Sequence, residues 1–157
     1  MATYVLILHC AAPCRVTVGA WGDVTLAAGV HLYVGSARRA WRARVNRHMQ
    51  STKKLRWHID YLLAVPEMQI ASVWLTQENR ECPTAQTLGS LPGVTLPGRR
   101  IGASDCRCPG HFLRLDSPLP VIEAPLRAWG FAPLADASET TSFSCRRARR
   151  SGVHAPW

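Results

Sequence analysis

The chain has 157 residues and a formal net charge of +9, and 47% of its residues are hydrophobic. This length accommodates one domain with a real core plus a tail, and the composition excludes a coiled coil and a collagen. No apolar run reaches the ~18 residues of a membrane span, and the apolar start lacks the basic region of a signal peptide. We therefore expect a soluble cytoplasmic protein without a membrane partner.

Arginine dominates the basic side chains, because Lys53 and Lys54 are the two lysines among 19 basic residues. A basic chain indicates a polyanionic partner, and guanidinium groups bind phosphate bidentately. We predict a nucleic-acid partner, with DNA favoured over RNA. A coding bias that replaces lysine by arginine is the alternative explanation of the arginine excess.

The predicted elements are strands and helices, and they occupy the first 115 residues. Branched and aromatic runs predict strands, and helical spacing of apolar residues with caps and prolines predicts helices. In chain order we expect a strand at 3–9, a hairpin at 15–19 and 24–26, a strand at 30–34, helices at 37–49 and 56–64, a strand at 70–75, a helix at 82–88, a Pro/Gly-rich loop at 91–110 and a closing strand at 111–115.

These elements predict a small α/β (α+β) domain over residues 1–117, with a mixed sheet of 3–5 strands flanked by 2–3 helices. Residues 118–157 are rich in proline and then basic, and we expect them to form a largely disordered tail. The arginine cluster at 145–150 would add nonspecific attraction to phosphate.

The predicted helix at 37–49 has an exposed cationic face next to a strand end. Amides at a helix N-terminus bind phosphate, and Ser36 is placed to cap this helix. Gly35 would allow a phosphate to approach closely, or would serve a turn that excludes a Cβ. The predicted nucleic-acid contacts are Gly35, Ser36, Arg38, Arg39, Arg42, Arg47, Lys53 and Lys54.

His48 and His58 are candidate general bases or phosphate ligands, because imidazole titrates near neutral pH. Packing in the core is the alternative for each histidine. Cys106, Cys108 and His111 form a second candidate group, since they supply three zinc-type ligands within six residues, with Cys82 or Asp105 as a fourth. The alternative is a pair of buried thiols, with Asp105 capping a turn.

The stretch Tyr33-Val34-Gly35-Ser36-Ala37, followed by Arg44, resembles the second half of the GIY-YIG nuclease signature, and Tyr4 fits the first half. A closer resemblance covers residues 2–115 and is to a small uncharacterised GIY-YIG-like domain that is sometimes fused to endonuclease III. It is based on residues 4–6, 29–37, 47–48, 57–61, 81–82 and 104–108, and on His111. A DNA-repair partner protein is what this resemblance implies.

The same resemblance implies catalytic roles for four residues. Tyr4 and Tyr33 would help to activate water, Arg44 would bind the scissile phosphate, and Glu81 would hold Mg²⁺ or Mn²⁺. A single carboxylate with substrate oxygens and waters is an ordinary Mg²⁺ site. We therefore predict a metal-dependent endonuclease that hydrolyses DNA or RNA. The alternatives are a degenerate nucleic-acid-binding module and a zinc-stabilised interaction domain.

Overall fold

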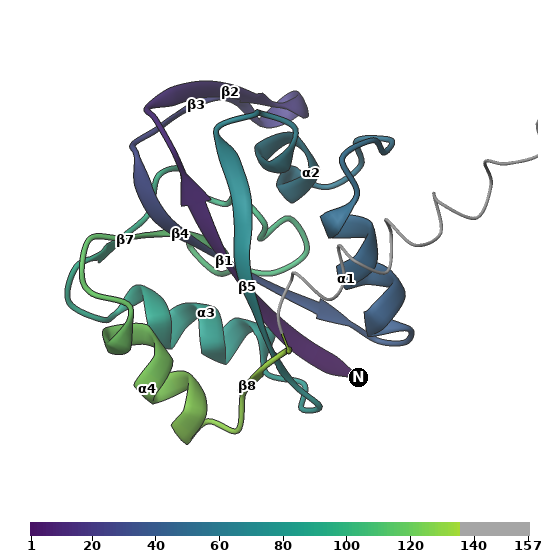
Figure 1. Cartoon of the computed structure of the whole chain (residues 1–157), viewed down its shortest axis with the longest axis vertical. Coiled ribbons are helices and arrows are strands. Elements are labelled where there is room, and N and C mark those ends of the chain that lie inside the picture. The colour runs from purple at the N-terminus through teal and green to yellow at the C-terminus, as the bar shows by residue number, and fades with distance from the viewer. Residues whose placement is uncertain (136–157) are drawn as a thin grey trace, which may run out of the picture.

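A six-stranded antiparallel sheet is the centre of the computed structural model, which describes residues 1–135 (Figure 1). The strand order is β6-β7-β4-β1-β5-β8. The bounds are β1 (Ala2–Cys10), β4 (Gly29–Ala37), β5 (Met68–Thr76), β6 (Val94–Thr95), β7 (Phe112–Leu115) and β8 (Ala132–Pro133). The predicted mixed α+β class is confirmed.

Alternation of side chains along β1 builds a core on both faces of this sheet. Leu6 and Leu8 belong to one buried cluster, whereas Val5 and Ile7 belong to the other. Successive side chains of a strand point to opposite faces, so a strand covered on both sides is apolar throughout. Full burial of each such side chain contributes about 1.5–3 kcal/mol.

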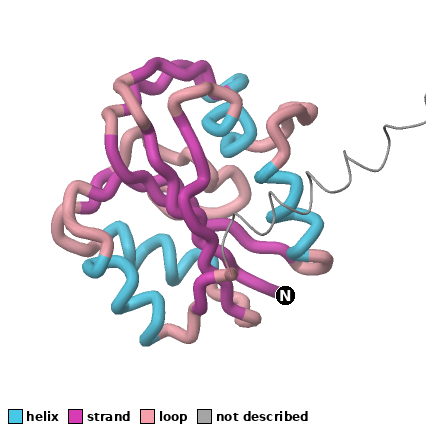
Figure 2. Tube along the Cα trace, in the orientation of Figure 1, coloured by secondary structure: helices cyan, strands magenta, loops and turns pink. Residues whose placement is uncertain are grey.

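One face of the sheet carries α1 (Trp41–Met49), α2 (His58–Leu63) and the hairpin of β2 (Cys14–Val18) and β3 (Gly22–Leu26), which the short helix η1 (Gly19–Trp21) joins. The other face carries α3 (Glu81–Gly89) and α4 (Pro120–Ala128). The helices of Figure 2 accordingly form two groups on either side of the strands. No helix within residues 1–135 is long and apolar enough to cross a membrane.

The predicted hairpin is present as a separate two-stranded sheet of β2 and β3, but the described part of the chain also has three elements that we did not predict, α4, β6 and β8. The prediction of a helix from residue 37 is wrong, because β4 continues to pair with β1 as far as Ala37. Ala40 then adopts φ 50°, and α1 begins at Trp41. Gly35 and Ser36 therefore lie within a strand, and Ser36 does not cap a helix.

The segment 118–135 is folded, although we expected it to belong to a disordered tail. Its helix α4 starts with Pro120, which is tolerated at the first helical position, and buries Ile122 and Leu126 against the sheet. These two residues are four apart and so lie on one helical face, whose burial outweighs the presence of Pro125 inside the helix. The predicted arginine cluster at 145–150 lies outside the described residues.

Candidate active site and metal cluster

A polar pocket forms where the edge of β4 is free of its neighbour β7. β7 pairs with β4 from Val30 to Tyr33, and the last contact between the two segments is the bond from the Val34 amide to the His111 carbonyl, at 2.9 Å. Beyond it, a pocket of about 330 Å³ lies between β4, α1, α2, the start of α3 and the loop at 102–105. The free edge thus leaves room for a site.

All six predicted catalytic side chains line this pocket, although they come from five different elements. They are Tyr4 of β1, Tyr33 of β4, Arg44 and His48 of α1, His58 of α2 and Glu81 of α3. Helix α3 packs on the far face of the sheet, but its first residue reaches around the free edge of β4. Arg44 and Glu81 therefore share one pocket.

Tyr4 and His48 form a buried pair, with the Tyr4 hydroxyl 2.9 Å from His48 Nε2. Burial, together with the charge of Lys53, lowers the pKa of His48 to about 4, so the imidazole is neutral at pH 7. Burial raises the pKa of the Tyr4 hydroxyl, which stays protonated. The pair is therefore a neutral phenol hydrogen-bonded to a neutral imidazole.

Tyr33 is also buried, and its burial raises the pKa of the phenol well above the ordinary value. Its ring lies against Gly102, where any side chain would clash, since a Cβ at that position would come within 2.8 Å of the Tyr33 ring. Gly102 also has φ +75°, which favours glycine. Because glycine has no Cβ and tolerates this φ, the loop at 102–105 can lie against the Tyr33 ring.

Arg44 is held by two contacts at the pocket wall. It donates to the Ser36 carbonyl at 2.9 Å, and its guanidinium carbon lies 4.6 Å from the centre of the Trp57 ring. A guanidinium has five N–H donors, so these contacts leave donors for an anionic ligand. Arg44 is thus an oriented cation beside the Tyr4–His48 pair.

Glu81 is bound through both carboxylate oxygens. Ser36 donates its hydroxyl to Oε2, and His111 Nδ1 lies 3.3 Å from Oε1. Burial raises the pKa of this carboxyl, but the hydrogen bonds from His111 and Ser36 and the charge of Arg44 outweigh burial and lower it. Glu81 is therefore ionised at neutral pH and faces both the pocket and His111.

His58 is oriented by the loop opposite it. Its Nδ1 accepts the Gly102 amide at 2.9 Å, which places the proton of the neutral ring on Nε2. Burial lowers the pKa of this histidine. His58 is thus a neutral donor at the pocket.

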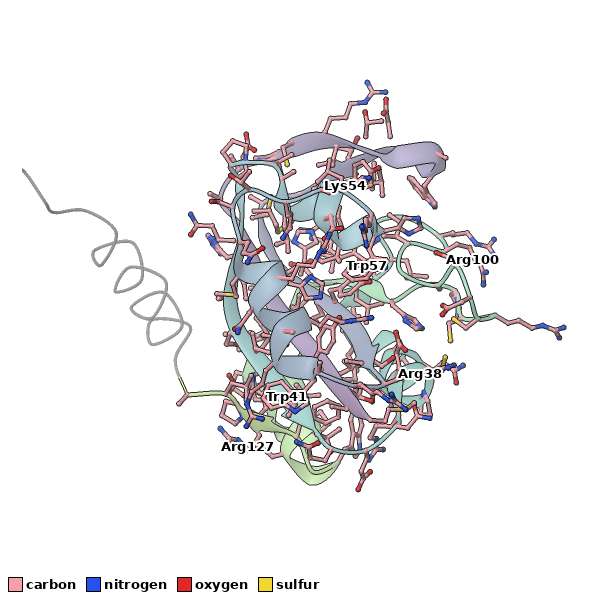
Figure 3. All side chains as sticks on the ribbon, turned by 90° about the vertical axis from the view of Figure 1, so that its right-hand side faces the viewer. Arg38, Trp41, Lys54, Trp57, Arg100 and Arg127 are labelled. Carbon is pink, nitrogen blue, oxygen red and sulfur yellow. The ribbon has the colours of Figure 1, made fainter. Side chains whose placement is uncertain are left out.

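Among the predicted nucleic-acid contacts, Arg47 and Lys53 are engaged within the protein. Arg47 donates to both oxygens of the buried Asp60, at 2.7 and 2.9 Å, and Lys53 donates to the carbonyls of Arg47 and His48. These contacts tie the end of α1 to α2. Arg38, Arg39 and Lys54 are exposed, and Figure 3 shows Arg38 and Lys54 on the face that carries Trp57. Gly35 and Ser36 line the pocket.

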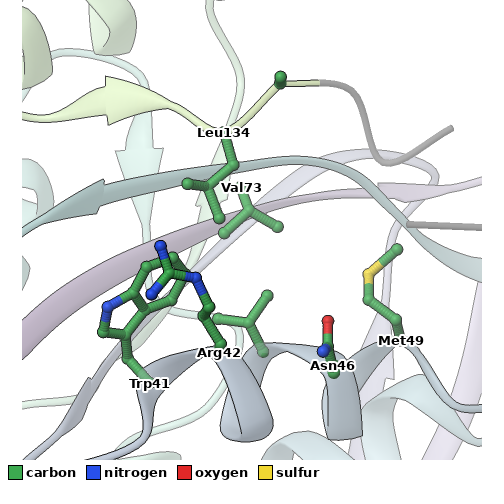
Figure 4. Close-up of a pocket in the computed structure, with 8 residues that line it drawn as sticks. Trp41, Arg42, Asn46, Met49, Val73 and Leu134 are labelled. Carbon is green, nitrogen blue, oxygen red and sulfur yellow. The ribbon is translucent and has the colours of Figure 1, made fainter. Parts of the chain in front are cut away.

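Arg42 faces a different hollow, because helical spacing separates it from Arg44 and His48. This groove of about 240 Å³ lies between α1 and β5 and is lined by Trp41, Arg42, Val45, Asn46, Met49, Val73, Leu134 and Ala135 (Figure 4). The Arg42 guanidinium stacks on Trp41 at 4.5 Å. Arg42 is therefore not part of the polar pocket.

A cysteine–histidine cluster lies next to the pocket. The ligand atoms of Cys82, Cys106, Cys108 and His111 all lie within 4.8 Å of one another. The chain thus brings together a group that could hold a metal ion, and these sulfur and nitrogen donors are of the type that zinc prefers and magnesium does not. Cys82, one of two fourth ligands considered from the sequence, belongs to the cluster, whereas Asp105 lines the pocket.

Hydrogen bonding within the cluster moves the pKa values of its thiols apart. Burial raises the pKa of Cys82 to about 12. Burial also acts on Cys108, but hydrogen bonds from His111 and its other neighbours outweigh it and lower that pKa to about 7. His111 is 1% exposed, and its Nε2 lies 3.6 Å from Cys106 Sγ and 3.9 Å from Cys82 Sγ.

Sequence reasoning missed two parts of the site. Trp57 serves as the platform on which Arg44 stacks, and the Gly102 amide orients His58. Trp57 lies within the helix predicted at 56–64 and Gly102 within the predicted loop at 91–110, but no local pattern tells which partner each of them meets. Only the packing of α1, α2 and the loop brings these pairs together.

The fold and site define an α+β protein with a polar pocket and an adjoining cysteine–histidine cluster. The chain matches the model of a family described as a domain of unknown function, DUF123, over residues 3–128, and it belongs to that family. This match corrects the sequence-based assignment to the GIY-YIG nucleases, which is wrong: the family matched is DUF123. No curated protein matches the chain, and no solved structure matches it either.

Proposed function

We propose that this chain is a metal-dependent endonuclease that hydrolyses phosphodiester bonds in DNA or RNA at the polar pocket. The observation that supports the proposal is the convergence of an oriented guanidinium, a tyrosine–histidine pair and an ionised carboxylate around about 330 Å³. Phosphodiester hydrolysis requires activation of water, neutralisation of phosphate charge and stabilisation of the leaving oxygen. The pocket has candidate groups for the first two requirements.

Arg44 is the proposed phosphate ligand. Its contacts with Ser36 and Trp57 hold the guanidinium in place before a substrate arrives, and its remaining donors can bind two phosphate oxygens. Preorganised donors of this kind stabilise the charge that develops in a transition state. His58 Nε2–H would add a neutral donor beside it.

Tyr4 and His48 are the proposed proton relay. The Tyr4 oxygen takes a proton from the attacking water while its own proton passes to His48 Nε2, so the water oxygen can bond to phosphorus as the bond to the leaving oxygen breaks. The leaving oxygen then takes a proton from solvent. An anion bound at Arg44 favours protonation of His48, because a nearby opposite charge raises the pKa of an imidazole.

Glu81 is the carboxylate that would hold Mg²⁺ or Mn²⁺ at the pocket, and the exposed Asp105 lines the same pocket. Mg²⁺ is commonly bound by one or two carboxylates and keeps several waters, so this donor set fits. Such an ion supplies neutralisation of phosphate charge when it is bound. The exposed Arg38, Arg39 and Lys54 would attract the rest of the nucleic acid.

The test is a cleavage assay on single- and double-stranded DNA and RNA, with and without added Mg²⁺ or Mn²⁺. Arg44→Ala and Glu81→Gln should each lower kcat by about 10²-fold or more, because each removes a charge that contacts the reacting phosphate or its ion. Omission of the ion is preferable to a chelator, which would also remove zinc from the cysteine–histidine cluster.

The matched controls are Arg15→Ala and Glu78→Gln, which remove the same charges at exposed positions outside the pocket. Both should cleave like the wild type. If the wild type binds nucleic acid but cleaves none of the four substrates with either ion, the enzyme proposal fails and a nucleic-acid-binding module replaces it.

Zinc is the ion that we propose for the cluster of Cys82, Cys106, Cys108 and His111. A tetrahedral zinc with Zn–S bonds of about 2.3 Å needs ligand atoms about 3.5–4 Å apart, and the separations of at most 4.8 Å are close to that. A closed set of four protein ligands is typical of a structural site. If cleavage is absent and zinc is present, a zinc-stabilised interaction domain becomes the better description.

A further inference from the structure

We infer that Glu81 couples the cysteine–histidine cluster to the pocket: it orients His111 as a zinc ligand, and zinc binding in turn fixes Glu81 at the pocket. The second half of this inference rests on the proposed function of the pocket. The first half concerns the metal site alone.

His111 is placed between two sets of partners. Its Nε2 faces the sulfurs of Cys106 and Cys82, and its Nδ1 faces Glu81 Oε1 at 3.3 Å. A neutral imidazole has one proton, so Nε2 can bind a metal only when Nδ1 carries that proton. The Glu81 carboxylate accepts the Nδ1 proton and thereby selects the metal-binding tautomer, as outer-shell carboxylates do in zinc sites.

The chain also links the two sites covalently, because Glu81 and Cys82 are adjacent in the first turn of α3. Successive residues of a helix point about 100° apart, so one can face the pocket while the next faces the cluster. Binding of Zn²⁺ forms three Zn–S bonds and one Zn–N bond and releases to solvent the protons that the three thiols still carry. The ion then holds Cys82 directly, and Glu81 through His111.

The metal half is tested by measuring zinc affinity in competition with a chromophoric chelator. Glu81→Ala should weaken zinc binding by about 10–100-fold, the usual effect of losing an outer-shell partner. Glu78→Ala removes a carboxylate whose side chain is 66% exposed, in the loop between β5 and α3, and this variant should bind zinc like the wild type. Unchanged affinity in Glu81→Ala, or no stoichiometric zinc in the wild type, would overturn the inference.

A measurement on the wild type keeps the test decisive if Glu81→Ala does not fold. In protein loaded with ¹¹³Cd²⁺, nitrogen NMR should show coupling of the metal to His111 Nε2 and a proton on Nδ1. Coupling to Nδ1 instead, or an unprotonated Nδ1, contradicts the role of Glu81.

The coupling half is tested by amide hydrogen exchange, which does not depend on cleavage. Removal of zinc from the wild type should speed exchange in the first turn of α3, including the Thr84 amide that donates to the Arg80 carbonyl at 2.9 Å. Unchanged exchange would mean that the ion does not hold Glu81. Failure of the nuclease proposal would leave both of these readouts interpretable.

Discussion

Glycine at position 35 decides how closely Tyr4 can lie against β4. A Cβ at this position would come within 2.5 Å of Tyr4 Cζ and Oη, whereas real Cβ contacts are longer. Gly35 pairs with Tyr4 across the β1–β4 ladder, so the ring lies directly over it. The Tyr4 ring is therefore the reason that position 35 requires glycine, and the pocket depends on the close approach of this ring to β4.

Gly35→Ala should lower the free energy of unfolding by about 1–3 kcal/mol, the usual cost of overpacking. The added methyl group displaces the Tyr4 ring, so the bond to His48 should lengthen and cleavage should fall with it. Chemical denaturation and the cleavage assay measure the two effects.

Gly89→Ala is the matched control, because a Cβ there meets nothing closer than Leu113 Cδ2 at 3.8 Å. Gly89 ends α3, where alanine has the higher helix propensity. The control should be as stable as the wild type or slightly more stable. Equal stability of Gly35→Ala and Gly89→Ala would contradict the proposed role of Gly35.

Helix α4 is folded, although the proline content of its segment predicts disorder. Its sequence contains Pro120 and Pro125, which favour irregular structure, yet the helix covers the far face of the sheet. Ile122 and Leu126 are fully buried there, while Leu119 is 37% exposed. The energy of apolar burial thus outweighs the cost of a proline in a short helix.

Ile122→Ala and Leu126→Ala should each destabilise the protein by about 2–5 kcal/mol, since each leaves a cavity under α4. Leu119→Ala removes the same kind of side chain from an exposed position and should cost well under 1 kcal/mol. Thermal or denaturant unfolding compares the three. Small and similar effects would show that α4 is not an integral part of the fold.

Across the whole molecule, buried neutral histidines make stability depend on pH. Burial lowers the pKa of His31, His48 and His58, with His48 at about 4. The unfolded chain binds protons that the folded chain excludes at these sites, so acid favours unfolding. Asp60, whose pKa Arg47 holds down against the effect of burial, acts in the same direction at lower pH.

His48 should contribute stability that is fully present above pH 6.5 and is lost as the pH falls toward about 4. The size of this contribution is about 3 kcal/mol, from a pKa difference of roughly two and a half units. In His48→Gln the free energy of unfolding should change less between these pH values. His9→Gln, at an exposed position, should keep the wild-type profile. Parallel profiles for wild type and His48→Gln would contradict the prediction.

The sequence by itself determined the fold class and most of the elements, because these depend on periodicity and propensity. Residue chemistry indicated His48 and His58 as candidates, whereas Tyr4, Tyr33, Arg44 and Glu81 were candidates only through the resemblance to the GIY-YIG signature. The sequence placed three of the four residues of the metal cluster, since these lie within six positions of one another. It failed at the end of β4 and at α4, where strand pairing and burial outweigh local preferences.

Only the tertiary structure decided which groups meet. The contacts between Tyr4 and His48, and between Glu81 and both Ser36 and His111, join residues 30 to 45 positions apart. Such distances in the chain leave no local pattern, because they depend on how the antiparallel strands pair and where the edge of β4 is left free. The same packing commits Arg47 to Asp60 and turns Arg42 toward another groove, although both have the same side chain as Arg44.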